Sequence, residues 1–478
     1  MAILDNIEPK AVFKYFEQMC GIPHGSGNTK AVSDWLVNFA KENGLEYYQD
    51  DMNNVIIIKE ATEGYENSQP IILQGHIDMV CEKAPDCNKN METEGLDLVV
   101  EGDVLRAEGT TLGGDNGIAV AMAMAVLASD DLSHPRVEAV FTVDEEIGLL
   151  GATGLDVSKL KGKRMLNIDS EDEGIFTVSC AGGNVTECIL PVTRESFHGS
   201  AYEVKIDSLL GGHSGVEIHK GRANSNVLMG RVLYKLSKET ELRIISVDGG
   251  LKDNAIPRET IAKVIVSDEK TFDDVCLAMC EFIKSEYSST DPDIRFTINP
   301  IKNISALDKD STDKVICMLC CLPDSVQEMS ADIPGLVQTS LNMGVLKTAE
   351  EQVTASFCVR SSITSQKELM TDRLTCLMNN LGGKTVVSGD YPGWKYRKQS
   401  PLRDLMIEVF TQQYGKEPKI EAIHAGLECG LFAGKIPDLD CISFGPDLKD
   451  IHTYSERVSI SSVQRVWTMI IEVLKRMK

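Results

Sequence analysis

Short aliphatic runs alternate with helix-like segments through the N-terminal part of this chain. The runs occupy residues 54–60, 70–80, 136–146 and 164–170. Continuous β-branched and aliphatic runs of this length are typical of strands that are buried on both faces, as in parallel sheets covered by helices. Residues 9–43 have helical periodicity, and the Ala- and Met-rich residues 115–129 follow the glycine turn LGGD and predict a buried helix. The pattern predicts an α/β fold with a mostly parallel sheet and helices on both faces.

The pattern changes near residues 181–184 and returns after about residue 390. Between these points a strand, a polar turn and a helix occur twice in the same order, at residues 259–287 and 352–382. This order predicts a duplicated α+β unit, although residue identity is too low for a sequence repeat. A chain of 478 residues also exceeds what one hydrophobic core usually serves. We therefore expect one domain formed by residues 1–184 and 391–478 and an inserted α+β domain formed by residues 185–390.

The C-terminal part resumes the first pattern. Residues 400–415 predict a helix, residues 441–446 a strand, and residues 459–478 a closing amphipathic helix. We expect these elements to complete the core of the first domain.

The charge of the chain limits its partners. A formal net charge of -24 disfavours nucleic acid, because phosphate binding requires clustered Lys and Arg. The N-terminal residues have no secretory signal pattern, and no stretch has the apolar length to span a bilayer. Fourteen scattered Cys residues in such a chain indicate reduced thiols. We expect a cytoplasmic protein that binds neither membrane nor nucleic acid.

Residues that can bind metal stand at the ends of several predicted strands or in the loops just after them. They are His76 and Asp78 in GHIDMV, Asp115 in LGGDNG, Glu145 and Glu146 in TVDEEIG, Asp169 in LNIDSED, and His452 in the later segment FGPDLKDIHTYSE. Ligands of open α/β sheets bind at the carboxyl ends of the strands, so these groups are expected to converge on one crevice.

A pair of zinc ions that act together requires residues of this kind. One carboxylate bridges the ions, nitrogen and oxygen ligands complete each site, and a free carboxylate takes a proton from metal-bound water. The adjacent Glu145 and Glu146 can divide the last two roles. Because residues i and i+2 of a strand face the same way, Asp78 is expected to accept the second ring N–H of His76 and so fix its tautomer.

Each of these signals has an ordinary structural explanation when it stands alone. A lone His-x-Asp is more often incidental, Glu-Glu pairs are common on surfaces, and Asp in a Gly-Gly-Asp-Asn turn usually serves the turn. Their joint occurrence at successive strand ends favours a metal site.

The same segments resemble the co-catalytic zinc peptidases, the family that includes aminoacylase, carnosinase and the bacterial aminoacyl-histidine dipeptidases. The resemblance covers essentially the whole chain and rests on GHIDMV, TTLGGDNGIAVAMAMAVL, FTVDEEIGLLGA, LNIDSEDEG, GGHSG and HTYSE, in the family's order. It is greatest to the aminoacyl-histidine (Xaa-His) dipeptidases, which share the large middle domain and the DEEIGL run.

The resemblance implies two bound divalent ions and a role for each candidate ligand. Asp115 would bridge the ions, His76 and Asp169 would complete one site, and Glu146 and His452 would complete the other. Zinc is the expected metal, although the same ligands accept manganese or cobalt.

The resemblance also implies catalytic and substrate-binding residues. Glu145 would be the general base, Asp78 would orient His76, and His213 in GGHSG would stabilise the oxyanion, in its own subunit or in that of a dimer partner. The residues that would bind the substrate's C-terminal carboxylate are Asn254, Arg360 and Gly426.

The expected function is metal-dependent hydrolysis of short peptides, above all Xaa-His dipeptides, in a homodimer. Residues 1–184 and 391–478 would form the catalytic di-metal domain, and residues 185–390 a lid and dimerisation domain. The same site would also suit N-acylated amino acids, as in aminoacylases, or tripeptides. A catalytically silent peptide-binding scaffold is a further alternative, but every candidate position holds a chemically competent residue.

Overall fold

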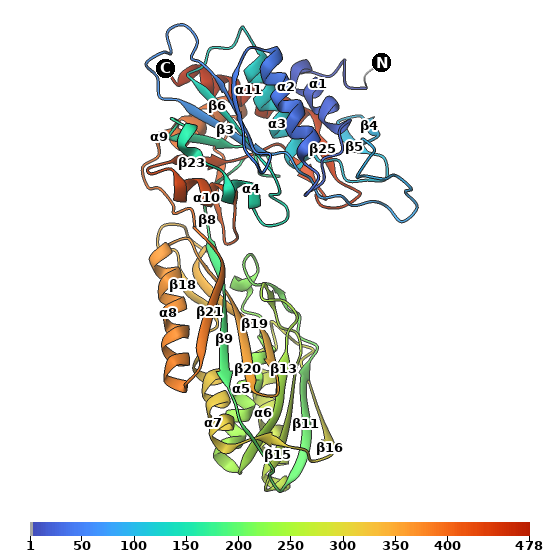
Figure 1. The fold of residues 1–478 in the computed structure, drawn as a ribbon, viewed down its shortest axis with the longest axis vertical. Helices are drawn as coiled ribbons and strands as arrows, with labels where there is room; N and C mark the ends of the chain where they lie inside the picture. Colours follow the sequence, from blue (N-terminus) through green and yellow to red (C-terminus); the bar gives the residue numbers. More distant parts are fainter. Residues whose placement is uncertain (1–2) are drawn as a thin grey trace. The chain divides into compact units, whose positions relative to one another are not determined.

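A computed structural model describes residues 3–478, and the chain divides into two compact units (Figure 1). The first unit comprises the residues up to Ser179 together with Tyr396–Ala422 and Leu427–Lys478. The second unit comprises Cys180–Lys395 and the short segment Ile423–Gly426. Each unit has its own hydrophobic core.

The first unit contains an eight-stranded sheet in the order β1-β2-β6-β3-β7-β23-β8-β22. Its strands are β1 (Glu46–Gln49), β2 (Val55–Lys59), β3 (Ile71–His76), β6 (Val137–Thr142), β7 (Arg164–Asn167), β8 (Ile175–Cys180), β22 (Lys419–Ile423) and β23 (Asp440–Ser443). The central strands β6, β3, β7 and β23 are parallel, whereas β1, β2 and β8 pair antiparallel with their neighbours. The predicted α/β fold is confirmed, with the parallel strands at the centre of the sheet.

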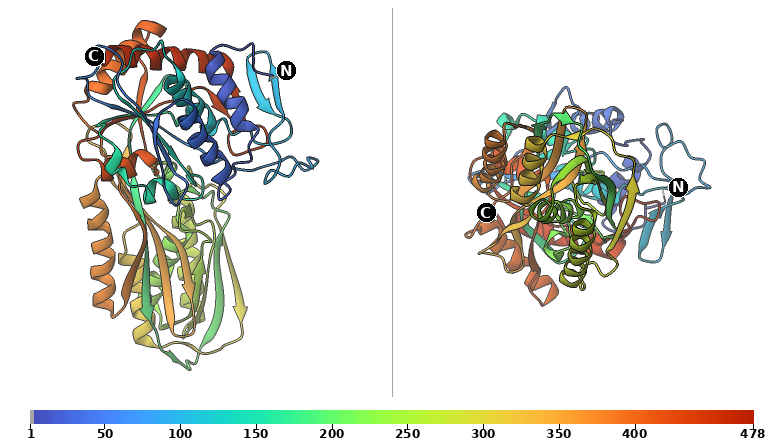
Figure 2. Two further views of the ribbon diagram at one scale, coloured as in Figure 1. Left: turned by 45° about the horizontal axis from the view of Figure 1, so that its top comes forward. Right: turned by 90° about the horizontal axis from the view of Figure 1, so that it is seen from below.

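Helices pack on both faces of this sheet. They are α1 (Lys10–Cys20), α2 (Lys30–Glu42), α3 (Gly114–Ala128), α4 (Leu150–Gly154), α9 (Pro401–Tyr414), α10 (Glu428–Lys435) and α11 (Ile460–Arg476). The face that carries Leu73 packs into the core formed with α1, α2, α3, α9 and α11. On the opposite face, Gln74 contacts Glu428 at the start of α10. The N-terminal helices (blue) and α11 (red) belong to the same unit, as Figure 1 and the left view of Figure 2 show.

The composition of two helices explains their burial. The predicted Ala- and Met-rich helix is α3, which is apolar on all sides and buried from Asn116 to Leu127. The closing helix α11 is amphipathic, and its N-cap Ser459 accepts a hydrogen bond from the amide of Ser462.

A small sheet brings the C-terminal region against the N-terminal half of this unit. It has the order β24-β25-β5-β4, with β4 (Leu98–Glu101), β5 (Val104–Ala107), β24 (Leu448–Lys449) and β25 (Arg457–Ser459). The turn between β24 and β25 carries His452, so this sheet positions a residue distant in sequence near the strand ends of the main sheet.

The second unit contains a nine-stranded sheet in the order β16-β11-β15-β13-β19-β20-β9-β21, with β18 paired to β19. Its strands are β9 (Gly182–Pro191), β11 (Ser200–Asp207), β13 (Leu242–Gly249), β15 (Thr260–Val266), β16 (Arg295–Ile301), β18 (Ser325–Met329), β19 (Val337–Thr348), β20 (Gln352–Ser361) and β21 (Lys384–Tyr391). Two short ladders join β10 (Arg194–Glu195) to β17 (Ala306–Leu307) and β12 (Gly212–His213) to β14 (Ala255–Ile256).

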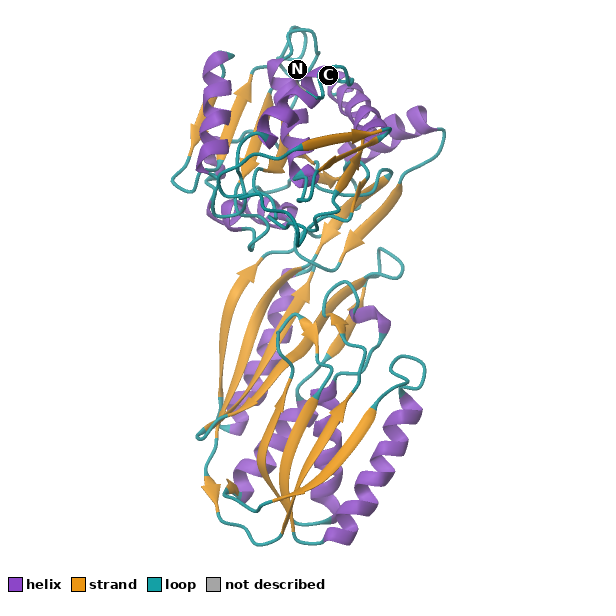
Figure 3. Cartoon of the chain, turned by 90° about the vertical axis from the view of Figure 1, so that its right-hand side faces the viewer, coloured by secondary structure: helices purple, strands orange, loops and turns teal. Residues whose placement is uncertain are grey.

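The long helices of the second unit are α5 (Ser225–Glu239), α6 (Glu269–Glu286), α7 (Lys309–Cys321) and α8 (Thr364–Leu381). They lie against the strands (Figure 3). Alternate residues of each strand enter the core, as with Val353, Ala355 and Phe357 of β20. The two predicted strand-helix pairs correspond to β15 with α6 and to β20 with α8. In the sheet, β13 and β19 lie next to each other and separate β15 from β20. Within residues 3–478, no helix has the length and apolar character needed to cross a bilayer.

Candidate active site

The carboxyl ends of β3 and β7 and the start of α3 place three candidate ligands together. His76 is the last residue of β3, and its Nε2 lies 3.3 Å from Asp115 Oδ1. The same nitrogen lies 3.5 Å from Oδ1 of Asp169, which comes just after β7. His76, Asp115 and Asp169 therefore form one potential metal site at the centre of the parallel strands.

The other oxygen of Asp115 faces a second pair of ligands. His452 Nε2 lies 3.3 Å from Asp115 Oδ2 and 2.8 Å from Glu146 Oε1. His452 adopts a φ of 58°, in the left-handed region that is strained for a non-glycine residue and is often found at functional sites. Asp115 thus stands between His76 on one side and His452 on the other, in the position of a bridging carboxylate.

The donor atoms suit divalent cations. One ligand atom each of His76, Asp115 and Glu146 lies within 4.8 Å of the others. Imidazole nitrogen and carboxylate oxygen are the ligands of catalytic zinc, and they also bind manganese and cobalt. The residues that the sequence singled out fit a pair of cations bridged by Asp115.

The electrostatics of the cluster favour bound positive charge. Hydrogen bonds to Asp115 and then to Glu146 raise the pKa of His452 to about 10. Burial raises the pKa of Glu145 to about 9; the charge of His76 opposes this rise and the charge of Asp169 adds to it. Carboxylates outnumber imidazoles here, and cations would offset the excess negative charge.

Asp78 holds the loop that carries the two glutamates. Its carboxylate accepts hydrogen bonds from the amides of Glu145 (3.0 Å) and Glu146 (3.4 Å) and from Ser26 Oγ (2.8 Å). His76 Nδ1 lies 3.0 Å from the main-chain oxygen of Asp78 and 3.5 Å from its carboxylate. Strand alternation predicts the carboxylate as the acceptor of the ring N–H. The carbonyl lies closer because β3 ends at His76, so the alternation of a strand does not extend to Asp78.

Two further residues, to which the sequence patterns assigned no role, hold the backbone around Asp115 and His76. Glu456 is 3% exposed, and its carboxylate accepts hydrogen bonds from three amides of the loop that carries Asp115. Asn116 accepts a hydrogen bond from the amide of His76 (3.2 Å) and donates one to the carbonyl of Ile168 (2.6 Å). A Cβ on Gly75 would lie 2.3 Å from Asn116 Oδ1, so this approach requires glycine. Glu456 belongs to the motif HTYSE and Asn116 to the motif GGDNG. Their closeness in sequence to His452 and Asp115 was the only feature that could have marked them.

Glu428 is a buried carboxylate near the ends of β3 and β6. It is 0% exposed, and it accepts a hydrogen bond from Thr142 Oγ1 at 2.8 Å and another from Gln74. Burial raises the pKa of Glu428 to about 7. No sequence pattern distinguished it from the other glutamates.

In the second unit, His213 is held as a neutral hydrogen-bond donor. Its Nδ1 accepts hydrogen bonds from the amides of Gly215 (3.1 Å) and Val216 (3.2 Å). Burial and the charge of Arg360 lower the pKa of His213. A neutral imidazole whose Nδ1 accepts carries its proton on Nε2, which leaves that N–H to donate.

The candidate carboxylate-binding residues also belong to the second unit. Arg360 is 7% exposed, and its Nη1 donates to the hydroxyl of Tyr391 at 3.2 Å. A Cβ on Gly426 would lie 2.9 Å from the Tyr391 ring, so glycine lets this ring pack closely. The carbonyl of Asn254 accepts a hydrogen bond from the amide of Ser214, next to His213.

His424 lies in the same region. It is 6% exposed and its Nε2 lies 2.7 Å from Ser340 Oγ. Burial, together with the charges of Arg360 and His213, lowers the pKa of His424 to about 3. His424 and Tyr391 were not predicted as site residues, because neither stands in a recognisable chemical pattern.

The α/β fold and the candidate ligands on the two sides of Asp115 are those of a metal-dependent hydrolase. A family model described as peptidase family M20/M25/M40 matches residues 72–476, and the chain belongs to this family. It is therefore a peptidase, as the sequence predicted.

Similar proteins cover almost the whole chain. Over 482 residues the chain is 36% identical to the cytosol non-specific dipeptidase of Escherichia coli (strain K12), a match that covers 99% of each protein. The crystal structure of aminoacylhistidine dipeptidase from Vibrio alginolyticus matches with a TM-score of 0.95 and 36% identity, over 99% of this chain and 97% of that one. The aminopeptidase PepT of Bacillus cereus ATCC 10987 shares the fold at a TM-score of 0.57 and 15% identity, over 98% and 99% of the chains.

Proposed function

We propose that this enzyme is a dipeptidase that uses two zinc ions to hydrolyse Xaa-His and related dipeptides. The observation that carries the proposal is the position of Asp115, with one oxygen facing His76 and the other facing His452. The dipeptide substrate is supported by the names of the two relatives at 36% identity, a non-specific dipeptidase and an aminoacylhistidine dipeptidase.

The five metal ligands of the proposal are His76, Asp115, Glu146, Asp169 and His452. When bound, the two ions lower the pKa of a water molecule toward neutrality and polarise the peptide carbonyl. These side chains would hold the ions in place, and hydrogen bonds to Glu456 restrain the loop that carries Asp115.

Proton transfer is assigned to Glu145. Bound cations would lower the pKa of Glu145 from the value of about 9 to which burial raises it. The carboxylate would then accept the proton of the attacking water and pass it to the nitrogen of the leaving amine. Asp78 supports this role because it binds the amide of Glu145 and so holds the loop in place. His213 donates its Nε2 proton in a hydrogen bond to the oxyanion, for which a neutral imidazole is suited.

Recognition of the substrate's C-terminal carboxylate is assigned to Arg360, with Asn254 and Gly426 beside it. A guanidinium presents parallel N–H donors that match a carboxylate. Arg360 Nε is buried and has no hydrogen-bond partner among the described residues, so a bound carboxylate would satisfy this donor. An N-acylated amino acid also ends in a carboxylate, and it remains the competing substrate together with tripeptides.

We further propose that the enzyme is a cytoplasmic homodimer and that residues 185–390 act as its lid and dimerisation domain. This proposal rests on the family resemblance and on the word "cytosol" in the name of the Escherichia coli relative. Sedimentation of the purified protein tests it: a monomer at all concentrations would contradict the dimer.

The test of function combines two variants with metal analysis. Glu145→Gln should keep its metal and lose about 10²- to 10⁴-fold in turnover, as expected for loss of a general base. Asp115→Ala should lose metal as well as activity. Substantial turnover by Glu145→Gln would remove Glu145 from the role of base, and metal bound at wild-type level by Asp115→Ala would contradict the bridge.

A substrate panel tests specificity. The enzyme is stripped with a chelator, and zinc, manganese or cobalt is restored singly before assay with β-Ala-His, other dipeptides, tripeptides and N-acetyl amino acids. We expect zinc to restore hydrolysis and dipeptides to exceed the other substrates. Greater activity on N-acetyl amino acids would favour an aminoacylase, and a metal-free, inactive protein would favour the binding scaffold.

A further inference from the structure

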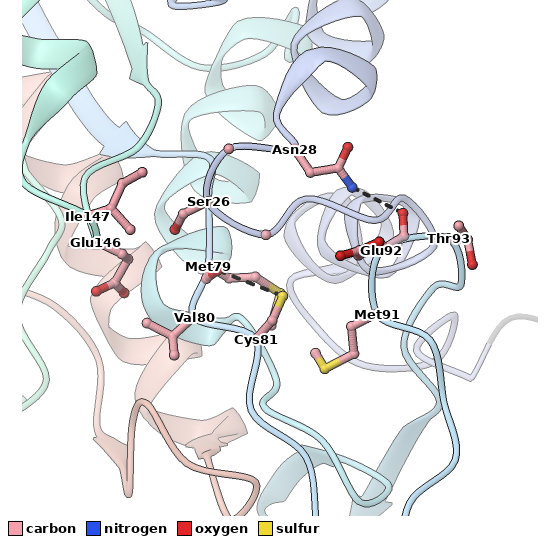
Figure 4. A pocket seen from close by; sticks show the side chains of 12 residues that line it. Ser26, Asn28, Met79, Val80, Cys81, Met91, Glu92, Thr93, Glu146 and Ile147 are labelled. Atoms are coloured by element: carbon pink, nitrogen blue, oxygen red, sulfur yellow. Dashed lines mark hydrogen bonds between the residues drawn. The ribbon is translucent and has the colours of Figure 1, made fainter.

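A cavity of about 820 Å³ opens in the first unit beside the metal ligand Glu146. Its walls come from three loops, at residues 25–28, 79–81 and 91–93, and from Glu146 with Ile147 (Figure 4). None of the metal ligands except Glu146 lines it. Glu146 therefore lies at the boundary between the cavity and the metal cluster.

Hydrogen bonds hold the walls of this cavity in place. Asn28 Nδ2 donates to the carbonyl of Glu92 at 3.1 Å and joins two of the loops (Figure 4). The amide of Gly27 donates to Asp144 Oδ1 at 2.6 Å, and Ser26 Oγ donates to Asp78. The loop at residues 25–28 is thus bound to the same aspartate that positions Glu145 and Glu146.

A small residue is required where two loops meet. A Cβ on Gly25 would lie 2.6 Å from Cys81 Sγ, so a larger residue there would push the loops apart. The cavity is a preformed feature of the chain because glycine and fixed hydrogen bonds shape it.

The lining combines apolar surface with negative charge. Met79, Val80, Met91 and Ile147 supply the apolar part. Glu92 supplies a carboxylate that is free to act on a ligand, whereas the charge of Glu146 would be offset by the metal that it is proposed to bind. No Lys, Arg or His of the described chain is among the lining residues. Methionine side chains adapt to ligands of different shape, so such a cavity selects weakly by size. The apolar side chains favour apolar groups, and the charge of Glu92 favours cationic groups over anionic ones.

We propose that this cavity is the subsite for the side chain of the substrate's N-terminal residue. The inference rests on the proposed dipeptidase function, in which Arg360 binds the C-terminal carboxylate. The peptide carbonyl that the metals would polarise belongs to the N-terminal residue, so the side chain of that residue must lie beside the metal ligands, and Glu146 is both a proposed ligand and part of the cavity wall. A cavity of about 820 Å³ exceeds what one side chain needs, so the subsite accepts large and small residues and discriminates by charge.

Charge inversion at Glu92 tests the subsite. The exposed Glu92 is replaced by lysine, and kcat/KM is measured for Lys-Gly, Leu-Gly and Asp-Gly and for the reversed series Gly-Lys, Gly-Leu and Gly-Asp. We expect the wild type to favour Lys-Gly over Asp-Gly and Glu92→Lys to lower this ratio about ten- to hundredfold, less at high salt. The ratio of Gly-Lys to Gly-Asp should stay within about twofold of wild type.

Asp86→Lys is the matched control. Asp86 is exposed in the same loop region, does not line the cavity, and undergoes the same change of charge. It should leave both ratios unchanged. Metal content measured for each variant should equal that of the wild type, because neither residue belongs to the ligand set.

A second variant tests the shape of the subsite independently of charge. Met91→Trp places a large ring in the cavity and should reduce hydrolysis of Trp-Gly at least tenfold more than hydrolysis of Ala-Gly. Equal effects on both substrates would contradict the assignment, as would an unchanged Lys-Gly to Asp-Gly ratio in Glu92→Lys or an equal shift in Asp86→Lys. A wild type that hydrolyses no dipeptide overturns the proposed function and the subsite with it, whereas an active enzyme with unshifted ratios overturns the subsite alone.

Discussion

Replacing Glu456 with glutamine should weaken metal binding without removing any metal ligand. Glu456 Oε2 accepts hydrogen bonds from the amides of Leu112 (2.7 Å) and Gly113 (2.9 Å), and Oε1 accepts one from Asp115 (3.2 Å). The carboxylate is buried, and it connects the loop that carries His452 to the loop that carries Asp115. The variant changes this connection and leaves every proposed ligand in place.

The expected magnitude is set by these hydrogen bonds. Glutamine keeps one oxygen, which can still accept from Leu112 and Gly113, but its NH₂ group then faces the amide of Asp115. One charge-assisted hydrogen bond is lost and two donors oppose each other, which costs about 1.5–3 kcal/mol. Loss of a partner that orients a ligand lowers metal affinity about 10- to 100-fold.

Glu138→Gln is the matched control. Glu138 is 0% exposed and accepts hydrogen bonds from the amides of Lys161 (2.9 and 3.0 Å) and Gly162 (2.9 Å), but it does not bind the Asp115 loop. Both variants should lower the free energy of unfolding, and Glu138→Gln should lower it at least as much, because it also removes the ion pair of Glu138 with Arg136 Nε at 2.9 Å. Only Glu456→Gln should bind metal more weakly.

The measurement is zinc occupancy in metal buffers, together with the visible absorption spectrum of the cobalt-substituted protein. A change in the cobalt spectrum reports altered ligand geometry, which a general loss of stability would not produce. Zinc affinity and a cobalt spectrum equal to wild type in Glu456→Gln would refute the positioning role, as would an equal loss of affinity in Glu138→Gln.

Three further predictions concern separate parts of the chain. Arg360→Ala should raise KM for dipeptides about 10- to 100-fold and lower kcat less, because a charged hydrogen bond to the carboxylate is lost; the reverse pattern would contradict the clamp. Asp207→Asn should lose about 1 kcal/mol at pH 7, since Arg295 pairs with Asp207 through both oxygens and lowers its pKa to about 2, while Arg295 itself is largely exposed. The pKa of Asp207 in the folded protein lies below its usual value, so the stabilisation by this ion pair is complete above about pH 4 and is lost as the pH falls through about 2. Urea denaturation at several pH values should therefore show that the free energies of unfolding of the wild type and Asp207→Asn converge at low pH. Phe176→Ala should lower the free energy of unfolding by about 3–5 kcal/mol, because Phe176 is 1% exposed and packs edge-on against two phenylalanine rings at 5.6 and 6.1 Å; a loss below about 1 kcal/mol would show that the site is filled by repacking.

Much of the first unit could be predicted from local patterns. Its strands β2, β3, β6 and β7 are aliphatic runs, and α3 is an uninterrupted apolar segment after a glycine turn. Parallel strands of this kind bring the residues at their carboxyl ends to one edge of the sheet, so the grouping of His76 with Asp169 was foreseeable from the residues alone. His452 was harder to place, because only the small sheet of β24 and β25 with β5 brings it to that edge.

Contacts that depend on exact backbone paths were not predictable. The alternation rule assigned the ring N–H of His76 to the carboxylate of Asp78, but the strand ends too early and the carbonyl lies closer. The contact of Arg360 with Tyr391 and the close packing of Gly426 against that ring join residues from three separate segments. No local pattern marks such a partner.

The sequence by itself determined the kinds of donor in this enzyme, their order along the chain and the strand ends that present them, because these depend on periodicity over a few residues. Only the tertiary structure decided which oxygen of Asp115 faces which histidine, that Glu456 binds the Asp115 loop across 341 positions of sequence, and that a cavity opens beside Glu146. The physical reason is that a contact between distant segments depends on how whole sheets and loops pack, and that packing is a property of the complete fold.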